Sequence, residues 1–145
     1  MLISDLANAG STPVLSEMMR FAGARQRILA HNIANLDTPD FRPADVSVSD
    51  FRAALSSAVR ARRAAGGGES GALAPAETRE VVRAGEGMRL EPRTSRGGVL
   101  LHDRNNRDTE RLMQDLAENA MVYRATTDLL RRQGDVLRVA ITQRP

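Results

Sequence analysis

Mostly apolar side chains recur at alternating spacings of four and three residues at both ends of this chain. The first run is Leu15, Met19, Ala22, Gln26, Leu29, Ile33 and Leu36, and the second is Leu112, Leu116, Asn119, Tyr123, Thr126, Leu130, Gln133, Leu137 and Ala140. This spacing is a heptad seam, which is typical of helices that pack along their length. We therefore expect a mainly α fold in which long N- and C-terminal helices form an antiparallel coiled coil.

The N-terminal segment, residues 1–38, is predicted to hold the first of these helices. Thr12 is the expected N-cap. Pro13 suits the first helical position, because the backbone N–H of that position is unpaired in any helix and proline loses no hydrogen bond there. The helix should end near Leu36, since Thr38 precedes a proline and is pushed out of the α region.

The middle segment, residues 39–104, should begin with extended chain and a short helix. Ser49 or Asp50 is the expected cap of this helix. Its apolar face should consist of Phe51, Leu55 and Val59.

From residue 66 to residue 98 the composition shifts to Gly, Pro, Glu and Arg, which favours a flexible connector or a loop that is ordered only in an assembly. Residues 81–82 and 88–90 are short apolar pieces that suit the two strands of a small β-hairpin, although Gly85 and Gly87 weaken the pattern.

The C-terminal segment, residues 105–145, is predicted to be one helix that is capped by Asn106 or Asp108 and runs to Ile141. Both helical stripes are wider than a single partner helix can cover, so we expect further helices from other subunits to pack on them.

The composition argues against a large core within the chain itself. Aromatic residues make up only 3% of the 145 residues, and much of the 41% hydrophobic content is Ala, which buries little area per residue. All 21 basic side chains are Arg and the formal net charge is +3. The sequence pI of about 10.8 therefore overstates the basicity, because Arg stays protonated beyond about pH 12.

Residue types that carry most enzyme chemistry are scarce or scattered. The chain has no Cys, and its two histidines, His31 and His102, lie on different predicted elements without ligand spacing around them. Residues 103–114 depart from the calcium-loop pattern at Arg107 and Gln114. We therefore expect no enzyme activity, no metal and no cofactor.

Targeting signals are also missing from the pattern. Residues 1–10 lack the basic and apolar regions of a secretory signal, and no apolar run approaches the roughly 18 residues of a membrane span. These features predict a cytoplasmic chain without a lipid anchor.

Two asparagines, Asn32 and Asn35, share a face near the end of the first predicted helix. If that face is buried, each amide needs a hydrogen-bond partner and fixes register more than it adds stability. The alternative is a helix C-terminus with solvated side chains, since Asn is a poor helix former.

The residues around these asparagines resemble the N-terminal signature of bacterial flagellar axial proteins. The signature is written A-x-N-I-A-N-x-x-T-P-G-Y followed by a basic residue, and residues 30–42 of this chain read AHNIANLDTPDFR. Asp40 stands where the family has Gly, and Phe41 stands where it has Tyr. Residues 105–123, NNRDTERLMQDLAENAMVY, resemble the N-N-x-D-x-E … M-x-x-L-A-E-N-x-x-x-Y pattern of the family's proximal rod members.

This resemblance implies a structural subunit of the proximal rod of the flagellar basal body, which helps connect the membrane ring and export gate to the rod. The terminal helices would line the inside of the rod as a coiled coil, and the middle would meet neighbouring subunits. The implied partners are other rod proteins, the rod-base adaptor, the membrane-ring and export-gate proteins, and further copies of the chain.

The resemblance also overrides the cytoplasmic prediction, because such proteins reach the periplasmic rod through the flagellar type III export apparatus without a cleaved signal peptide. The residues that we then expect at subunit interfaces are Leu29, Asn32, Ile33, Asn35, Leu36, Leu116, Asn119, Tyr123, Leu130 and Leu137.

Two alternatives remain open at this point. The chain could be another rod subunit of the same family, since these share the first motif. It could instead be an Arg-rich helical module that binds nucleic acid or an acidic partner, as Arg60, Arg62 and Arg63 suggest. No aromatic residues are interleaved there as stacking platforms, so a solvated face is favoured and we expect no nucleic-acid partner.

Overall fold

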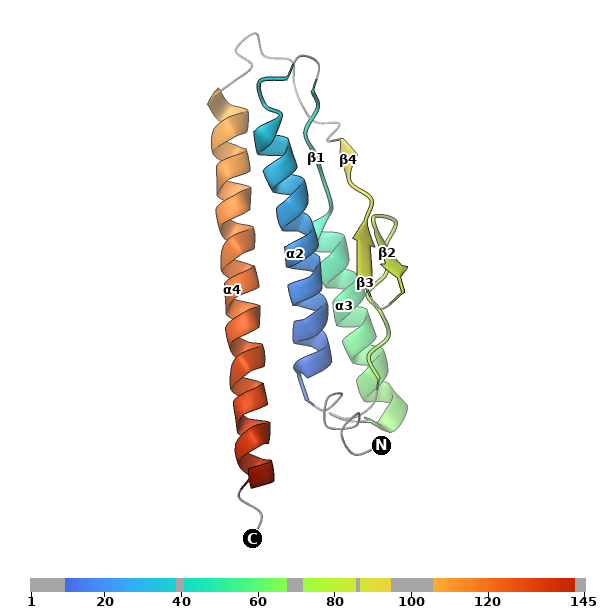
Figure 1. The fold of residues 1–145 in the computed structure, drawn as a ribbon. Helices are drawn as coiled ribbons and strands as arrows, with labels where there is room; N and C mark the ends of the chain where they lie inside the picture. The colour runs from blue at the N-terminus through green and yellow to red at the C-terminus, as the bar shows by residue number, and fades with distance from the viewer. Residues whose placement is uncertain (1–9, 39–40, 68–71, 86, 95–105, 143–145) are drawn as a thin grey trace.

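The computed structural model describes residues 10–38, 41–67, 72–85, 87–94 and 106–142. The helices are α2 (Thr12–Ala34), α3 (Val48–Arg62), which continues into a π-helical turn η1 (Arg63–Gly67), and α4 (Asn106–Thr142). The strands are β1 (Ala44–Asp45), β2 (Val81–Ala84), β3 (Gly87–Leu90) and β4 (Arg93–Thr94). Helix α2 lies in the middle, with α4 on one side and α3 and the strands on the other (Figure 1). The prediction of a mainly α fold is confirmed.

Helix α2 begins one position earlier than the sequence indicated. Ser11 is the N-cap and Thr12 already lies in the first turn, together with Pro13. The hydroxyl of Ser11 does not cap the helix but donates to Oε1 of Gln133 on α4, at 3.1 Å. The predicted cap, Thr12, was therefore wrong, because proline also fits the second helical position. The predicted end is close, since α2 stops at Ala34.

Helix α3 is capped by Ser47, whose hydroxyl accepts a hydrogen bond from the backbone N–H of Asp50 at 3.1 Å. The predicted caps, Ser49 and Asp50, were wrong because both already lie in the first turn. The predicted apolar face is correct for Phe51, Leu55 and the half-buried Val59; Ala58 and Arg62 complete the buried side.

The predicted hairpin is confirmed. Strands β2 and β3 pair antiparallel, with Val81 opposite Leu90, and Gly85 adopts a positive φ of 61° in the turn between them. Val81 is only 2% exposed and belongs to the core. The expectation of a flexible connector is therefore wrong for residues 72–85 and 87–94, because their few apolar side chains dock on the helices.

The apolar core lies between α2, α3 and the hairpin. Its buried members are Phe21, Val46, Phe51, Leu55, Ala76 and Val81. The rings of Phe21 and Phe51 stack with centroids 3.9 Å apart and planes 3° from parallel. In the described part of the chain, this cluster includes no side chain of α4.

Helix α4 packs along α2 in the opposite direction (Figure 1). Its 37 residues make it roughly 55 Å long. The start of α2 meets the late part of α4 at Gln133, and Arg25 near the end of α2 meets Asp115 near the start of α4. The described helix already includes both predicted caps, Asn106 and Asp108, so neither caps it, and the residues before it lie outside the described part of the chain. The helix contains the predicted last residue, Ile141, and is described to Thr142.

Seven of the nine residues of the predicted heptad seam of α4 are buried or half-buried, whereas Tyr123 and Ala140 are exposed. Leu112, Asn119 and Thr126 are buried. Leu116, Leu130, Gln133 and Leu137 are half-buried. Because every fully buried position in this seam precedes Leu130, contact with α2 weakens toward the C-terminal end of α4.

Replacing Leu29 tests the packing of α2. Leu29 is fully buried, so Leu29→Ala should lower the free energy of unfolding by about 2–5 kcal/mol. Leu129→Ala is the matched control: this side chain is 48% exposed, and its loss should cost less than about 1 kcal/mol. Chemical denaturation of both variants at low protein concentration measures the difference, and equal losses would contradict the described packing.

Candidate assembly surface

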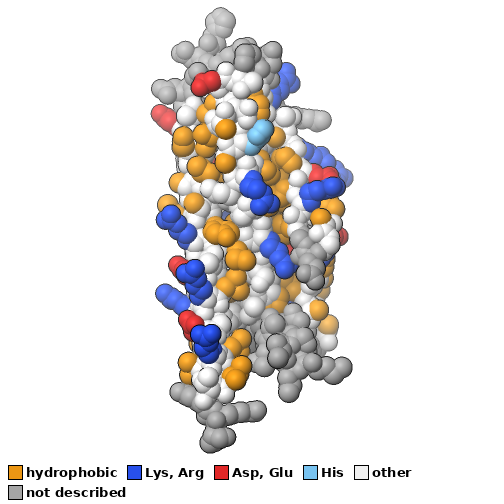
Figure 2. Space-filling model, in the orientation of Figure 1, with side chains coloured by type: hydrophobic (Ala, Val, Ile, Leu, Met, Phe, Trp, Pro, Cys, Tyr) orange, Lys and Arg blue, Asp and Glu red, His pale blue; other side chains and the backbone are white. Residues whose placement is uncertain are grey.

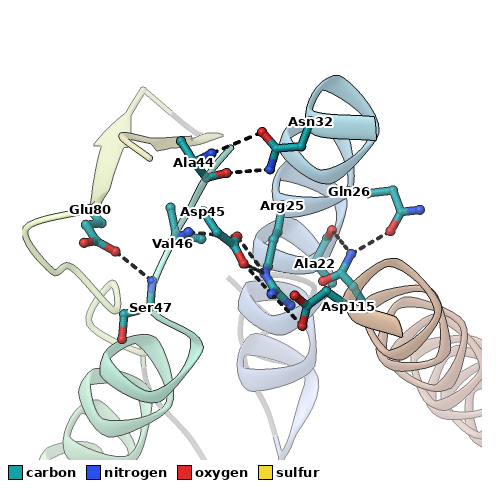
Figure 3. A network of polar contacts seen from close by, with 11 residues as sticks. Ala22, Arg25, Gln26, Asn32, Ala44, Asp45, Val46, Ser47, Glu80 and Asp115 are labelled. Carbon is teal, nitrogen blue, oxygen red and sulfur yellow. Dashed lines mark hydrogen bonds and ion pairs between the residues drawn. The ribbon is translucent and has the colours of Figure 1, made fainter. Parts of the chain in front are cut away.

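A buried arginine joins three elements near the centre of the molecule. Arg25 on α2 donates hydrogen bonds from Nε and Nη2 to the carboxylate of Asp45 on β1, with a distance of 3.0 Å from Nε to Oδ1. On its other side, Nη2 lies 3.8 Å from Oδ1 of Asp115 on α4 (Figure 3). One guanidinium thus links the strand layer, the central helix and the outer helix.

The charge of Arg25 is stable in this position. Burial pushes the pKa of Arg25 down, but the hydrogen bond to Asp45 and the charges of Asp45, Asp115 and Glu118 outweigh it and raise the pKa above its ordinary value. A raised pKa stabilises the fold below the unfolded-state pKa, and the effect is lost only as the pH rises through the folded-state value. Because an arginine side chain is protonated at neutral pH even without this rise, Arg25 stays charged there.

Asn32 hydrogen-bonds to the backbone that follows α2. Its side chain is 2% exposed; Nδ2 donates to the carbonyl of Ala44 at 2.7 Å, and Oδ1 accepts from the N–H of Ala44 at 3.2 Å (Figure 3). The side chain therefore satisfies both backbone groups of one β1 residue. The solvated alternative is wrong for Asn32, whose amide sets where β1 lies against α2.

Asn35 makes only local contacts at the end of α2. Its Nδ2 donates to the carbonyl of His31 at 2.8 Å, and its Oδ1 accepts from Oγ1 of Thr38 at 3.4 Å. The His31 ring meets Phe41 edge-on, with centroids 5.7 Å apart. These contacts close the helix terminus, so Asn35 fits the alternative of an ordinary polar C-terminus.

Asn119 plays the corresponding part between the two long helices. It is 4% exposed, and Nδ2 donates to the carbonyl of Ala22 at 2.9 Å and to Oε1 of Gln26 at 2.7 Å. Ala22 is buried and Gly23 lies against Tyr123, so small residues let the helices approach at this level. Because an amide must keep its partners when buried, Asn119 fixes how α4 is placed along α2.

The predicted interface residues are distributed along these two helices. Leu29, Asn32 and Asn119 are buried; Ile33, Asn35, Leu36, Leu116, Leu130 and Leu137 are half-buried; Tyr123 is exposed. The amides of Asn32 and Asn119 find their partners within the same chain. Contact of any of these residues with a second subunit stays a prediction.

A further apolar surface was missed by the sequence analysis. The seven large apolar side chains that are exposed in the described part of the chain all lie on α4: Met113, Met121, Tyr123, Leu129, Val136, Val139 and Ile141. Only Tyr123 was among the predicted interface residues. Figure 2 shows apolar side chains at the surface along this helix, beside a row of Arg side chains. Exposed apolar side chains that gather on one element suggest an interaction site, because soluble proteins rarely leave large apolar patches in water.

The Arg-rich end of α3 is partly structural. Arg62 is buried and donates from Nη1 to the carbonyl of Gly10 at 3.0 Å, whereas Arg60 and Arg63 are exposed. One of the three cations of the predicted basic cluster thus holds the start of α2, which leaves a weaker basic surface than the sequence indicated.

Other kinds of site were sought among the described residues. They contain no group of three or more His, Cys, Asp or Glu side chains that could hold a metal ion. None of the described helices combines the length and the apolar character that crossing a membrane requires.

Comparison with known proteins identifies no relative. No protein-family model, no curated protein and no solved structure matches this chain. The geometry of the helices and their exposed surface therefore carries the functional interpretation, together with the motifs in the sequence.

Replacing Asn32 tests its role in placing β1. Asn32→Leu keeps the volume but leaves the N–H and carbonyl of Ala44 unpaired, which should cost about 1–3 kcal/mol for each buried group. Asn35→Leu, whose hydrogen bonds are exposed, should cost less than about 1 kcal/mol. Denaturant unfolding distinguishes the two, and a neutral Asn32→Leu would contradict this role.

Arg25→Lys tests the link between the three elements. Lysine keeps the charge but loses the paired hydrogen bonds to Asp45. We expect a loss of about 1–2 kcal/mol of unfolding free energy, since Asp45 and Asp115 are about one third exposed and water screens them. The matched control, Arg27→Lys on the exposed side of α2, should change the free energy by less than about 0.5 kcal/mol.

Proposed function

We propose that this chain is a structural subunit of the proximal rod of the bacterial flagellar basal body. The observation that carries the proposal is the location of the exposed large apolar side chains, which in the described part of the chain all lie on one long terminal helix. Among the described residues, α4 lies beside α2 and contributes no side chain to the apolar core, so much of its surface is left for neighbouring subunits (Figure 1). The two motifs, at residues 30–42 and 105–123, resemble those of flagellar rod proteins, so we propose the rod as the assembly that this chain joins.

We also propose that α2 and α4 are the coiled coil of this subunit. Heptad positions Leu112, Leu116 and Asn119 face α2, as a seam of alternating three and four spacing requires. The buried amide of Asn119 replaces an apolar residue in that seam, and such a residue specifies register at a cost in stability.

The assembly chemistry suits an open helical stack. Such a stack needs two different surfaces on each subunit that complement each other. The exposed apolar side chains of α4 are one candidate surface, and the half-buried Ile33 and Leu36, at and just beyond the end of α2, are another. The proposed partners are other rod proteins, the rod-base adaptor, the membrane ring and the export gate. The chain would reach them through the flagellar type III export apparatus, without a cleaved signal peptide.

Another rod subunit of the same family is the second candidate. The N-terminal motif of residues 30–42 is shared among rod proteins, whereas the Leu-Ala-Glu-Asn pattern at residues 116–119 favours the proximal one.

Two acidic substitutions test the rod proposal in flagellated cells. Ile141→Asp places a charge on an exposed apolar position, and Leu130→Asp places one on the half-buried seam. Both should abolish motility because the rod does not assemble. Arg138→Asp, at an exposed charged position nearby, is the control and should leave cells motile.

Fractionation gives the direct readout. A tag placed between η1 and β2 should sediment with detergent-extracted basal bodies for the unchanged chain and for Arg138→Asp, but not for Ile141→Asp. Circular dichroism of the purified variants separates failed assembly from failed folding. Normal motility of both acidic variants, or a tagged chain that stays in the soluble fraction, would contradict the proposal.

A further inference from the structure

Helix α4 has a second regular face, which does not contact α2. We call it the outer stripe; it consists of Arg111, Gln114, Glu118, Met121, Ala125, Leu129, Arg132, Val136 and Val139. All of these residues are exposed. They recur at spacings of three and four, so they line one side of the helix. Helix α4 stands at the edge of the molecule, and the core lies beyond α2 (Figure 1).

The outer stripe is symmetric about Ala125. Glu118 and Arg132 lie at equal separations on either side of it and carry opposite charges. Met121 and Leu129 form the next matched pair, and both are apolar and exposed. If two copies of α4 run antiparallel around a twofold axis at Ala125, these two central pairs therefore match, while the side chains of Gln114 and Arg111 meet Val136 and Val139 at the ends of the stripe.

We propose that two copies of this chain form a closed antiparallel dimer through the outer stripe of α4. Glu118 then faces Arg132 of the partner subunit at two equivalent places. Met121 packs on Leu129 of the partner subunit, and Ala125 at the axis has the small side chain that close approach of two helices needs. A twofold interface of this kind is self-complementary.

The charged residues of the outer stripe select this occupant and this orientation. They are Arg111 and Glu118 in the first half of the stripe and Arg132 in the second half. Antiparallel pairing places Glu118 of each copy on Arg132 of the other. A parallel pair would instead bring Glu118 onto Glu118 and Arg132 onto Arg132.

The dimer would cover surface that the folded chain leaves open. The outer stripe from Arg111 to Val139 is roughly 42 Å long. It contains four of the seven exposed large apolar side chains: Met121, Leu129, Val136 and Val139. The proposal concerns the free chain and does not rest on the rod function; in a rod, neighbouring subunits would compete for the same helix.

A charge swap tests the dimer. The unchanged chain should show a monomer–dimer equilibrium in sedimentation velocity from micromolar to submillimolar concentration. Glu118→Arg and Arg132→Glu should each raise the dissociation constant about tenfold or more, because two attractions become two repulsions in one dimer. The combined variant Glu118→Arg/Arg132→Glu should restore the original constant. These two residues are roughly 21 Å apart along one helix, so the rescue can only come from a second copy.

Arg131→Glu is the matched control for the charge swap. It makes the same charge change next to Arg132, at an exposed position outside the outer stripe, and should leave the dissociation constant unchanged. Circular dichroism at the same concentrations verifies that all variants keep their helix content.

A single cysteine gives an independent readout. Because the chain has no Cys, Ala125→Cys can form a disulfide only between copies. Mild oxidation should convert Ala125→Cys to a covalent dimer, whereas Arg131→Cys should stay monomeric. A chain that is monomeric at every concentration, a dimer that ignores the charge reversals, or growth into open polymers would overturn the proposal. None of these outcomes depends on motility, so the rod proposal keeps its own test.

Discussion

The arrangement of this protein depends on one charged side chain that is removed from water. Arg25 is buried on the central helix and is compensated from both sides, by Asp45 on β1 and Asp115 on α4. An uncompensated buried charge is very costly. If the strand layer or the outer helix shifted, the guanidinium would therefore lose a carboxylate partner while it stayed buried. Asn32 and Asn119 act in the same way with smaller energies. The buried amide of Asn32 keeps its hydrogen bonds only while β1 stays in place, and that of Asn119 only while α4 stays in place along α2.

The apolar residues are divided unequally among the layers. The stacked rings of Phe21 and Phe51 and the other buried members of the core hold α2, α3 and the hairpin together. Helix α4 is attached through a seam in which the polar residues Asn119, Thr126 and Gln133 stand among leucines, and seven large apolar side chains of this helix are exposed. Such a division leaves the long helix under-packed in a single chain, which is the property expected of a protein that is completed by assembly.

Much of the fold was predictable because helical periodicity is a local signal. The two long helices, the face of α3 with Phe51 and Leu55, and the hairpin at Val81 follow from spacing and turn residues. The caps were less predictable. Ser47 and Ser11 flank the helices where Thr12, Ser49 and Asp50 were expected, since several adjacent polar residues can cap and tertiary contacts choose among them. The segment of residues 66–98 was predicted to be flexible because it is rich in Gly. Its spacing could not show that Ala76 and Val81 become buried, because their burial depends on packing with the helices.

The sequence by itself determined where the long helices run and which of their residues form the heptad seam, because these depend on neighbours within a few turns. Only the tertiary structure decided that Asn32 is buried and hydrogen-bonded to Ala44, whereas Asn35 makes only local hydrogen bonds. It also decided that Asn119 is hydrogen-bonded to Ala22 and Gln26. It likewise decided that, among the described residues, the exposed large apolar side chains lie on α4. The physical reason is that burial and hydrogen-bond satisfaction are properties of what another segment covers, and the spacing of residues along one helix does not contain that information.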